Sequence, residues 1–436
     1  MNRSVLPAGE LSGTLSPPAD KSVSHRAAIL NSLAAGSVTV HNYSEGADCR
    51  STLECLRLLG VTAEVVNPAE GSEEEPKLVL TSPGLENFNE PETVLDAQNS
   101  GTTMRFIMGL LGSTPFLSVV TGDRSLRARP MGRVVQPLRL MGAQVMGRGS
   151  DSLAPLAIRG GDLNGIEYTM PVASAQLKSA LLMAALFANG ETVLLQPALS
   201  RDHTERMLRA MGADVVEDGL ALVVRPGPKL TPMDITVSGD ISSAAFWLVA
   251  GAVHPNARIR LSNVGVNPSR TGVLDVLRDM GASVTEQNAR MEGGEPVADL
   301  MVESSELRGV EIGGDMIPIV QDEVPVLALA AALARGTTTI RDAQELRYKE
   351  SDRLHATATE LTKLGAKISE LPDGLVIEGS GALQGGACDS HGDHRLAMTL
   401  GIAGLVTREA VDIADADVVD ISYPGFWGDL DSLRGD

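Results

Sequence analysis

Lysine and arginine recur where this sequence predicts the first turn of a helix. Four such stretches, each with small polar residues typical of helix N-caps, are "DKSVSHR" (20–26), "NSGTTMR" (99–105), "SAQLKS" (174–179) and "DHRLA" (393–397). A cation there opposes the positive end of the helix dipole, where Asp or Glu would be stabilising. Each start alone could be a plain cap. Because this unfavourable interaction with the helix dipole recurs at four helix starts, it indicates that a bound anion offsets it. Lys21 and Arg26 are therefore candidate ligands of phosphate or carboxylate.

Three further stretches place charged residues together. "GDRSLRARPMGR" (122–133) puts four arginines into one predicted loop, for which a solvated surface loop is an equally good interpretation. "RYKESDRL" (347–354) sets Glu350 close to Arg353, which could also be a plain helix pair worth about 0.2–0.5 kcal/mol. Asp322 precedes a wholly apolar helix, a semi-buried position that favours a general acid or base.

Composition and missing motifs exclude several classes of function. A formal net charge of −20 over 436 residues argues against nucleic acid or an anionic membrane as the main partner. The three cysteines show no metal-ligand spacing and no disulfide framework, which fits a reducing cytoplasm. The N-terminus lacks an apolar signal region, and no apolar run is long enough to span a membrane. Nucleotide-binding and metalloprotease motifs are also missing, so we expect a cytoplasmic protein whose site uses no metal and no cofactor.

A repeated phrase indicates the elements that hold these residues. It reads as the end of a helix, a glycine C-cap and a strand. Its five copies are "LRLLGVTAEVV" (56–66), "LRLMGAQVM" (138–146), "LRAMGADVV" (208–216), "LRDMGASVT" (277–285) and "LTKLGAKIS" (361–369). A sixth, incomplete set follows at the C-terminus. One copy would be a common helix stop, but five in order predict six repeated α/β units.

Six motifs in order carry a resemblance to a known family. They are "DKSVSHRA", "NSGTTMR", "RPMGR", "SAQLKSALL", "KESDR" and "DHRLAM". Together, and over essentially the whole chain, they resemble 5-enolpyruvylshikimate-3-phosphate (EPSP) synthase, most closely its divergent bacterial branch. The resemblance implies a two-domain inside-out α/β barrel of six βαβαββ units, with the active site in the interdomain cleft. It implies an N-terminal domain at 20–238 and a C-terminal domain formed by 1–19 plus 239–436.

The same resemblance implies a reaction and its residues. The family transfers the enolpyruvyl group of phosphoenolpyruvate (PEP) to the 5-hydroxyl of shikimate 3-phosphate and releases phosphate, a step of aromatic amino acid biosynthesis. Asp322 would take the hydroxyl proton, Glu350 would protonate the methylene carbon, and Lys21 would touch both substrates. The residues implied for shikimate 3-phosphate are Lys21, Ser22, Arg26, Ser174, Gln176, Ser200, Arg201, Asp322 and Lys349. Those implied for PEP are Lys21, Asn99, Gly101, Arg129, Gln176, Arg353 and Arg395.

The resemblance also implies an inhibitor, and this sequence differs from the family pattern at two places. The glycine matching Gly101 lines the PEP pocket of the family, where glyphosate competes with PEP. "DISYPGF" has Ile421 and Ser422 where many members place a PEP-binding lysine, and Ala175 replaces a second serine. We expect a monomer whose partners are these small anions.

Two other functions share some of these features. The same-fold UDP-N-acetylglucosamine enolpyruvyl transferases usually carry a reactive cysteine before an Arg-Pro pair, and "GDRSLRARP" has none. A non-catalytic phospho-ligand module would not need Asp322 and Glu350 beside the cations.

Overall fold

The computed structural model describes residues 1–66, 77–227 and 229–435. They form two compact units, which we call the N-terminal unit (Ala19–Ser238 with Met291–Glu295) and the C-terminal unit (Met1–Pro18, Gly239–Arg290 and Pro296–Asp436). The segment Met291–Glu295, expected in the C-terminal domain, groups with the N-terminal unit, where Glu295 Oε1 lies 3.0 Å from His203 Nδ1. The chain therefore passes between the units four times.

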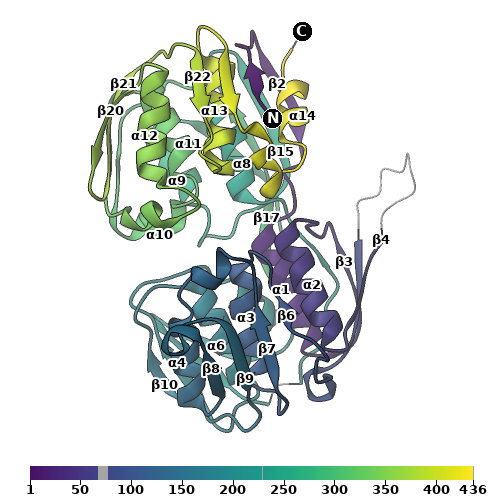
Figure 1. The fold of residues 1–436 in the computed structure, drawn as a ribbon. Coiled ribbons are helices and arrows are strands. Elements are labelled where there is room, and N and C mark those ends of the chain that lie inside the picture. Colours follow the sequence, from purple (N-terminus) through teal and green to yellow (C-terminus); the bar gives the residue numbers. More distant parts are fainter. Residues whose placement is uncertain (67–76, 228, 436) are drawn as a thin grey trace. The chain divides into compact units, whose positions relative to one another are not determined.

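The N-terminal unit contains three four-stranded sheets and the helices that they enclose (Figure 1). The helices are α1 (Lys21–Ser32), α2 (Ala47–Leu58), α3 (Gly101–Leu111), α4 (Gly132–Met141), α5 (Arg148–Asp151), α6 (Ala175–Ala185) and α7 (His203–Ala210). The strands are β3 (Ala35–His41), β4 (Thr62–Val66), β5 (Lys77–Pro83), β6 (Leu95–Asp96), β7 (Ser118–Thr121), β8 (Gln144–Gly147), β9 (Leu153–Arg159), β10 (Glu167–Thr169), β11 (Thr192–Leu195), β12 (Asp214–Asp218), β13 (Ala221–Arg225) and β14 (Ile235–Thr236). The sheet orders are β14-β3-β5-β4, β6-β7-β9-β8 and β10-β11-β13-β12.

The C-terminal unit repeats this plan. Its helices are α8 (Ile241–Val253), α9 (Gly272–Asp279), α10 (Ile317–Val320), α11 (Val324–Leu333), α12 (Arg353–Lys363), α13 (His394–Val406) and α14 (Phe426–Ser432). Its strands are β1 (Arg3–Val5), β2 (Leu11–Leu15), β15 (Ala257–Gly265), β16 (Ser283–Glu292), β17 (Glu295–Glu303), β18 (Glu311–Ile312), β19 (Arg335–Ile340), β20 (Lys367–Leu371), β21 (Gly374–Ser380), β22 (Gly386–Asp389) and β23 (Val411–Ala414). The sheet orders are β16-β17-β15-β2, β18-β19-β21-β20 and β1-β23-β22.

The six sheets share one topology, which confirms the predicted repeat. Each begins with a parallel pair, such as β6 with β7, and continues with an antiparallel neighbour, such as β9. The sixth sheet is shorter: β22 and β23 are parallel, and β1 from the start of the chain adds the antiparallel strand, with Arg3 opposite Ile413. The glycine of each repeated phrase has a positive φ of 93–117°, the left-handed backbone conformation with which α-helices commonly end. The two-domain α/β class and its six units are confirmed.

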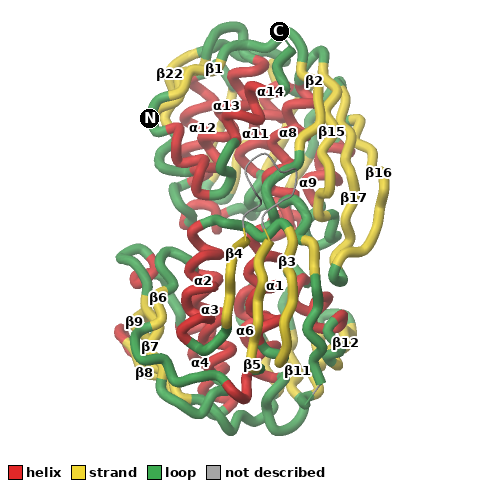
Figure 2. The backbone as a smooth tube through the Cα atoms, turned by 90° about the vertical axis from the view of Figure 1, so that its right-hand side faces the viewer, coloured by secondary structure: helices red, strands yellow, loops and turns green. Residues whose placement is uncertain are grey.

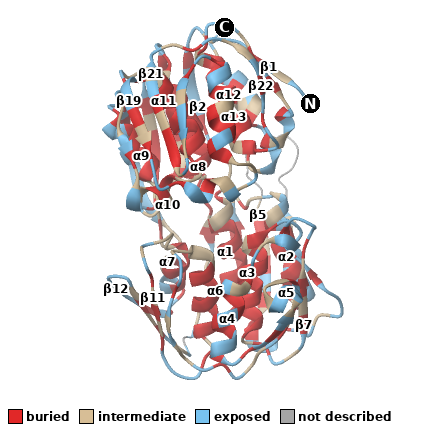
Figure 3. Cartoon of the chain, turned by 60° about the vertical axis from the view of Figure 1, so that its left-hand side comes forward, coloured by how far each residue is buried: buried red, intermediate tan, exposed pale blue. Residues whose placement is uncertain are grey.

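Apolar helices form the core of each unit. In the C-terminal unit, α8, α11 and α13 are apolar around nearly their whole circumference and lie buried between the sheets (Figure 3). In the N-terminal unit α1, α3 and α6 hold this place, with β3, β4 and β5 on their outer side (Figure 2). α3 and α6 approach closely because residue 109 is glycine: a Cβ there would lie 2.7 Å from the Ala180 Cα.

The inner helices begin where the sequence predicted. α1, α3, α6, α8 and α13 start after the side-chain caps Asp20, Ser100, Ser174, Asp240 and Asp393. These starts carry about half of the candidate site residues, namely Lys21, Ser22, Arg26, Gly101, Ser174, Gln176 and Arg395. Within the described ranges no single helix is long and apolar enough to cross a membrane; a pair bent by 111°, Gly314–Val320 with Val324–Leu333, reaches that length together, and its second helix is a core helix.

Candidate active site in two clusters

Lys21 and Arg26 lie on the first turns of α1. The Lys21 Nζ is 3.1 Å from Asp48 Oδ2, and this cation holds the pKa of Asp48 below its usual range although burial would raise it. The Arg26 guanidinium is buried and donates to Thr204 Oγ1 at 2.7 Å, to Ser179 Oγ at 3.1 Å and to the Ser22 carbonyl at 2.8 Å. Burial lowers the pKa of Arg26 to about 10, and Glu205 partly offsets that effect. Arg26 thus ties the start of α1 to α6 and α7.

Arg105 and Arg129 lie beside Gly101 at the start of α3, and Arg133 is close enough to Arg105 to lower its pKa. We call Arg105, Arg129 and Arg133 the arginine cluster. Arg105 Nη1 donates to Gln176 Oε1 at 2.6 Å and to the Gly101 carbonyl at 3.2 Å. Its Nε is buried with no hydrogen-bond partner among the described residues. The pKa of Arg105 is lowered to about 10, first by burial and then by repulsion from Arg133 and Arg129. The arginine cluster therefore has the electrostatic character of an anion site.

The remaining N-terminal candidates lie around α6 and α7. Ser174 caps α6 by accepting a hydrogen bond from the Leu177 N–H at 3.3 Å, and Ser200 Oγ donates to Gln196 Oε1 at 3.1 Å. Arg201 follows Ser200 and is close enough to Arg26 to lower that residue's pKa further. The cation of "SAQLKS", Lys178, does not need an external anion, because its buried Nζ lies 2.6 Å from Glu205 and donates to the Ser200 carbonyl at 3.1 Å.

In the C-terminal unit a single guanidinium gathers three carboxylates. Arg353, the first residue of α12, has a side chain that is 2% exposed. It lies 2.8 Å from Asp393 Oδ2, 2.6 Å from Glu350 Oε2 and 3.3 Å from Asp322 Oδ1. We call Asp322, Glu350 and Asp393 the acidic cluster. These carboxylates raise the pKa of Arg353 against the opposite effect of burial. Arg353 in turn lowers the pKa of Glu350 and of Asp393, although burial would raise both.

A second buried network adjoins the acidic cluster. Glu323 is buried next to Asp322, accepts a hydrogen bond from Ser242 Oγ, and has a pKa raised by burial and by Asp322. Arg395, which follows the cap of α13, donates to the Ser242 carbonyl at 3.3 Å and has a buried Nε without a described partner. Lys349 lies partly exposed on the turn before Glu350.

Comparison with known proteins decides the family. Residues 5–430 match the family model of EPSP synthase (3-phosphoshikimate 1-carboxyvinyltransferase). A 3-phosphoshikimate 1-carboxyvinyltransferase of Desulforudis audaxviator is 52% identical over 434 residues and covers 100% of both chains. The chain belongs to the EPSP synthase family. Another relative of the same name, from Synechococcus, is 52% identical over 98% of this chain and 95% of its own. The solved EPSP synthase of Acinetobacter baumannii has a TM-score of 0.91 at 41% identity, covering 99% of this chain and 98% of its own.

The family confirms what the motifs predicted about identity and activity. EPSP synthase, its transferase chemistry and its place in the shikimate pathway are confirmed, because the matched family model and the relatives at about 50% identity carry this name. Substrates of EPSP synthase are shikimate 3-phosphate and PEP.

Sequence reasoning did not identify three residues that contact the candidate site residues. They are Asp48, which pairs with Lys21; Arg105, which belongs to the arginine cluster; and Asp393, which pairs with Arg353. Arg105 and Asp393 stand inside the motifs "NSGTTMR" and "DHRLA", so their position was a usable signal. Asp48 has no such signal, because only the packing of α1 on α2 brings it to Lys21.

Proposed function

We propose that residues of both units carry out the enolpyruvyl transfer in the roles that the resemblance implied. Shikimate 3-phosphate would be held by Lys21, Ser22, Arg26, Ser174, Gln176, Ser200, Arg201, Asp322 and Lys349. PEP would be held by Lys21, Asn99, Gly101, Arg129, Gln176, Arg353 and Arg395. The observation that carries this proposal is the geometry of the arginine cluster: Arg105 Nη1 and Arg129 Nη1 would lie 2.7 Å and 3.6 Å from a Cβ on Gly101, and the buried Arg105 Nε has no hydrogen-bond partner among the described residues. A bound anion would relieve the repulsion between these guanidinium groups.

The acidic cluster would supply the proton transfers. The methylene carbon of PEP takes a proton and the 5-hydroxyl oxygen adds to C2, giving a tetrahedral intermediate. Loss of a proton and of phosphate then gives EPSP. Asp322 would accept the hydroxyl proton. The pKa of Glu350 is lowered by Arg353, so a donor role needs a change on substrate binding. PEP provides one, because an anion at Arg353 offsets that cation and raises the pKa of Glu350.

The role assignment predicts separable effects on the two Michaelis constants. Arg129→Lys and Arg395→Lys should raise the KM for PEP by about 10- to 100-fold, because each loses a planar charge-assisted contact. Ser174→Ala and Arg201→Lys should raise the KM for shikimate 3-phosphate instead. Steady-state kinetics with each substrate varied in turn measure this split. Equal effects of all four variants on both constants would refute the assignment.

Gly101→Ala should weaken inhibition by glyphosate far more than it raises the KM for PEP. A Cβ at residue 101 would lie 2.7 Å from Arg105 Nη1 and 3.6 Å from Arg129 Nη1, so the methyl group enters the arginine cluster. The Arg105 side chain can shift at its flexible end and still meet compact PEP, whereas the longer inhibitor has less room. Inhibition constants of both proteins check this, and equal values would mean that Gly101 does not face the PEP site.

We also propose that the enzyme is monomeric and cytoplasmic. The three cysteines are buried free thiols, which is compatible with a reducing compartment.

A further inference from the structure

The turn that leads into α3 has an unusual backbone. Gln98 has a φ of 52°, a left-handed conformation that side chains other than glycine rarely adopt. Such a conformation is strained and persists only when its surroundings hold it. The next residue, Asn99, and then Gly101 belong to the proposed PEP site.

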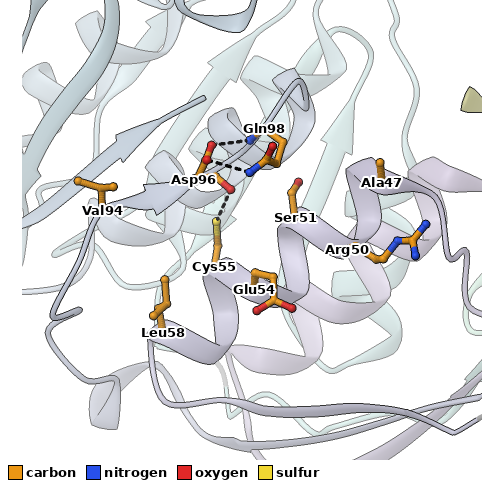
Figure 4. Close-up of a pocket in the computed structure, with 9 residues that line it drawn as sticks. All are labelled: Ala47, Arg50, Ser51, Glu54, Cys55, Leu58, Val94, Asp96 and Gln98. Carbon is orange, nitrogen blue, oxygen red and sulfur yellow. Dashed lines mark hydrogen bonds between the residues drawn. The ribbon is translucent and has the colours of Figure 1, made fainter. Parts of the chain in front are cut away.

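Asp96 is the group that holds this turn. Its carboxylate accepts a hydrogen bond from the Gln98 backbone N–H at 2.9 Å and another from Gln98 Nε2 at 2.8 Å (Figure 4). The backbone of Asp96 is itself fixed, because it lies in β6 beside β7 and its carbonyl accepts a hydrogen bond from Cys55 Sγ at 3.7 Å. Asp96 is therefore a fixed anchor with both hydrogen bonds directed to one residue.

The turn at Gln98 is connected by hydrogen bonds to the loop at 122–133, which carries Arg129. The Gln98 carbonyl accepts a hydrogen bond from the Asp123 N–H at 2.8 Å, and glycine at residue 122 permits the approach, since a Cβ there would lie 2.5 Å from that carbonyl oxygen. Asp123 Oδ2 then accepts from Asn99 Nδ2 at 2.6 Å, and Asn99 Oδ1 accepts from Arg129 Nη2 at 2.7 Å. Because a carboxylate only accepts, Asp123 fixes the Asn99 amide with its oxygen toward Arg129.

We propose that Asp96 is a positioning residue for PEP binding, acting through Gln98 and Asn99 on Arg129. This inference rests on the proposed role of Arg129. Asp96 and Gln98 are exposed and line an open cavity of about 320 Å³ (Figure 4). Water can replace the lost hydrogen bonds there, so removing the carboxylate should leave the fold intact and change the geometry of the turn.

The test is a double-variant cycle that uses glycine as a rescue. Asp96→Ala should raise the KM for PEP on the order of tenfold, with kcat and the KM for shikimate 3-phosphate changed by less than about twofold. Gln98→Gly alone should be close to wild type. In the Asp96→Ala/Gln98→Gly protein the KM for PEP should return to within about threefold of wild type, because glycine adopts a positive φ without steric cost. Asp214→Ala, which removes an exposed carboxylate paired with Arg225, is the matched control.

Two results would overturn the proposal: an unchanged KM for PEP in Asp96→Ala, or a double variant as impaired as the single one. Failure of the underlying role assignment gives a different pattern, in which Arg129→Lys leaves the KM for PEP unchanged. Amide hydrogen exchange then tests whether Asp96 positions the turn, independently of the role of Arg129 in PEP binding. Asp96→Ala should speed exchange of the Asp123 N–H, and Gln98→Gly should restore it; unaltered exchange contradicts the inference.

Discussion

Asp322→Asn should lower kcat by about 10²- to 10⁴-fold while the affinity for shikimate 3-phosphate changes by less than about tenfold. This is the range expected when a general base is lost. The amide keeps the size of the side chain, and Arg353 keeps Glu350 and Asp393 as partners, so the fold should not suffer. Single-turnover and steady-state kinetics, with calorimetric binding of shikimate 3-phosphate, measure both quantities.

The matched control for this variant is Asp315→Asn, an exposed carboxylate shortly before α10. It makes the same chemical change outside the acidic cluster and should leave kcat unaltered. Near-wild-type turnover of the purified Asp322→Asn protein would remove Asp322 from the mechanism.

Asp393→Asn should lower the free energy of unfolding by about 3–5 kcal/mol, the usual cost of breaking a buried ion pair from one side. Asp393 is fully buried and accepts from Arg353 Nε at 2.8 Å, from Ser351 Oγ at 3.1 Å and from the Arg395 N–H at 2.9 Å. The substitution leaves the buried Arg353 with less compensation and weakens the cap of α13. Denaturant unfolding measures the loss.

The effect of Asp393 on stability should depend on pH in a defined direction. Its pKa is lowered in the folded protein, because Arg353 outweighs burial. Its stabilising contribution is therefore complete above the unfolded pKa of about 3.9 and is lost as the pH falls through the folded value. The difference in free energy of unfolding between the wild type and Asp393→Asn should accordingly shrink below about pH 4.

The control variant is Asp431→Asn, which breaks the exposed pair with Arg3 and should cost at most about 1 kcal/mol. An equally small loss in Asp393→Asn would contradict the account of Arg353.

Local rules predicted much of the fold. The caps before α1, α3 and α6 and the glycines after the repeated helices act over a few residues, so their sequence signals are direct. The addition of β1 to the sixth sheet depends instead on a contact between Arg3 and Ile413 across nearly the whole chain. The grouping of Met291–Glu295 with the N-terminal unit is another long-range effect.

The candidate site divides in the same way. The pairing of Glu350 with Arg353 was predictable from their spacing, but the distant partners, Asp48 of Lys21 and Asp393 of Arg353, were not. Lys178 at a helix start resembled a ligand-binding cation, yet folding supplies Glu205 from α7 as its anion. Asp393 is brought to Arg353 only when α12 and α13 pack together.

We propose that this chain converts PEP and shikimate 3-phosphate through the arginine cluster and the acidic cluster. The most direct test is phosphate release by the purified protein from PEP with shikimate 3-phosphate, with UDP-N-acetylglucosamine, or with neither. We predict phosphate release from PEP only when shikimate 3-phosphate is the second substrate, at a rate that Asp322→Asn lowers by about 10²- to 10⁴-fold. Release that is independent of shikimate 3-phosphate, or that occurs with UDP-N-acetylglucosamine instead, would contradict the account.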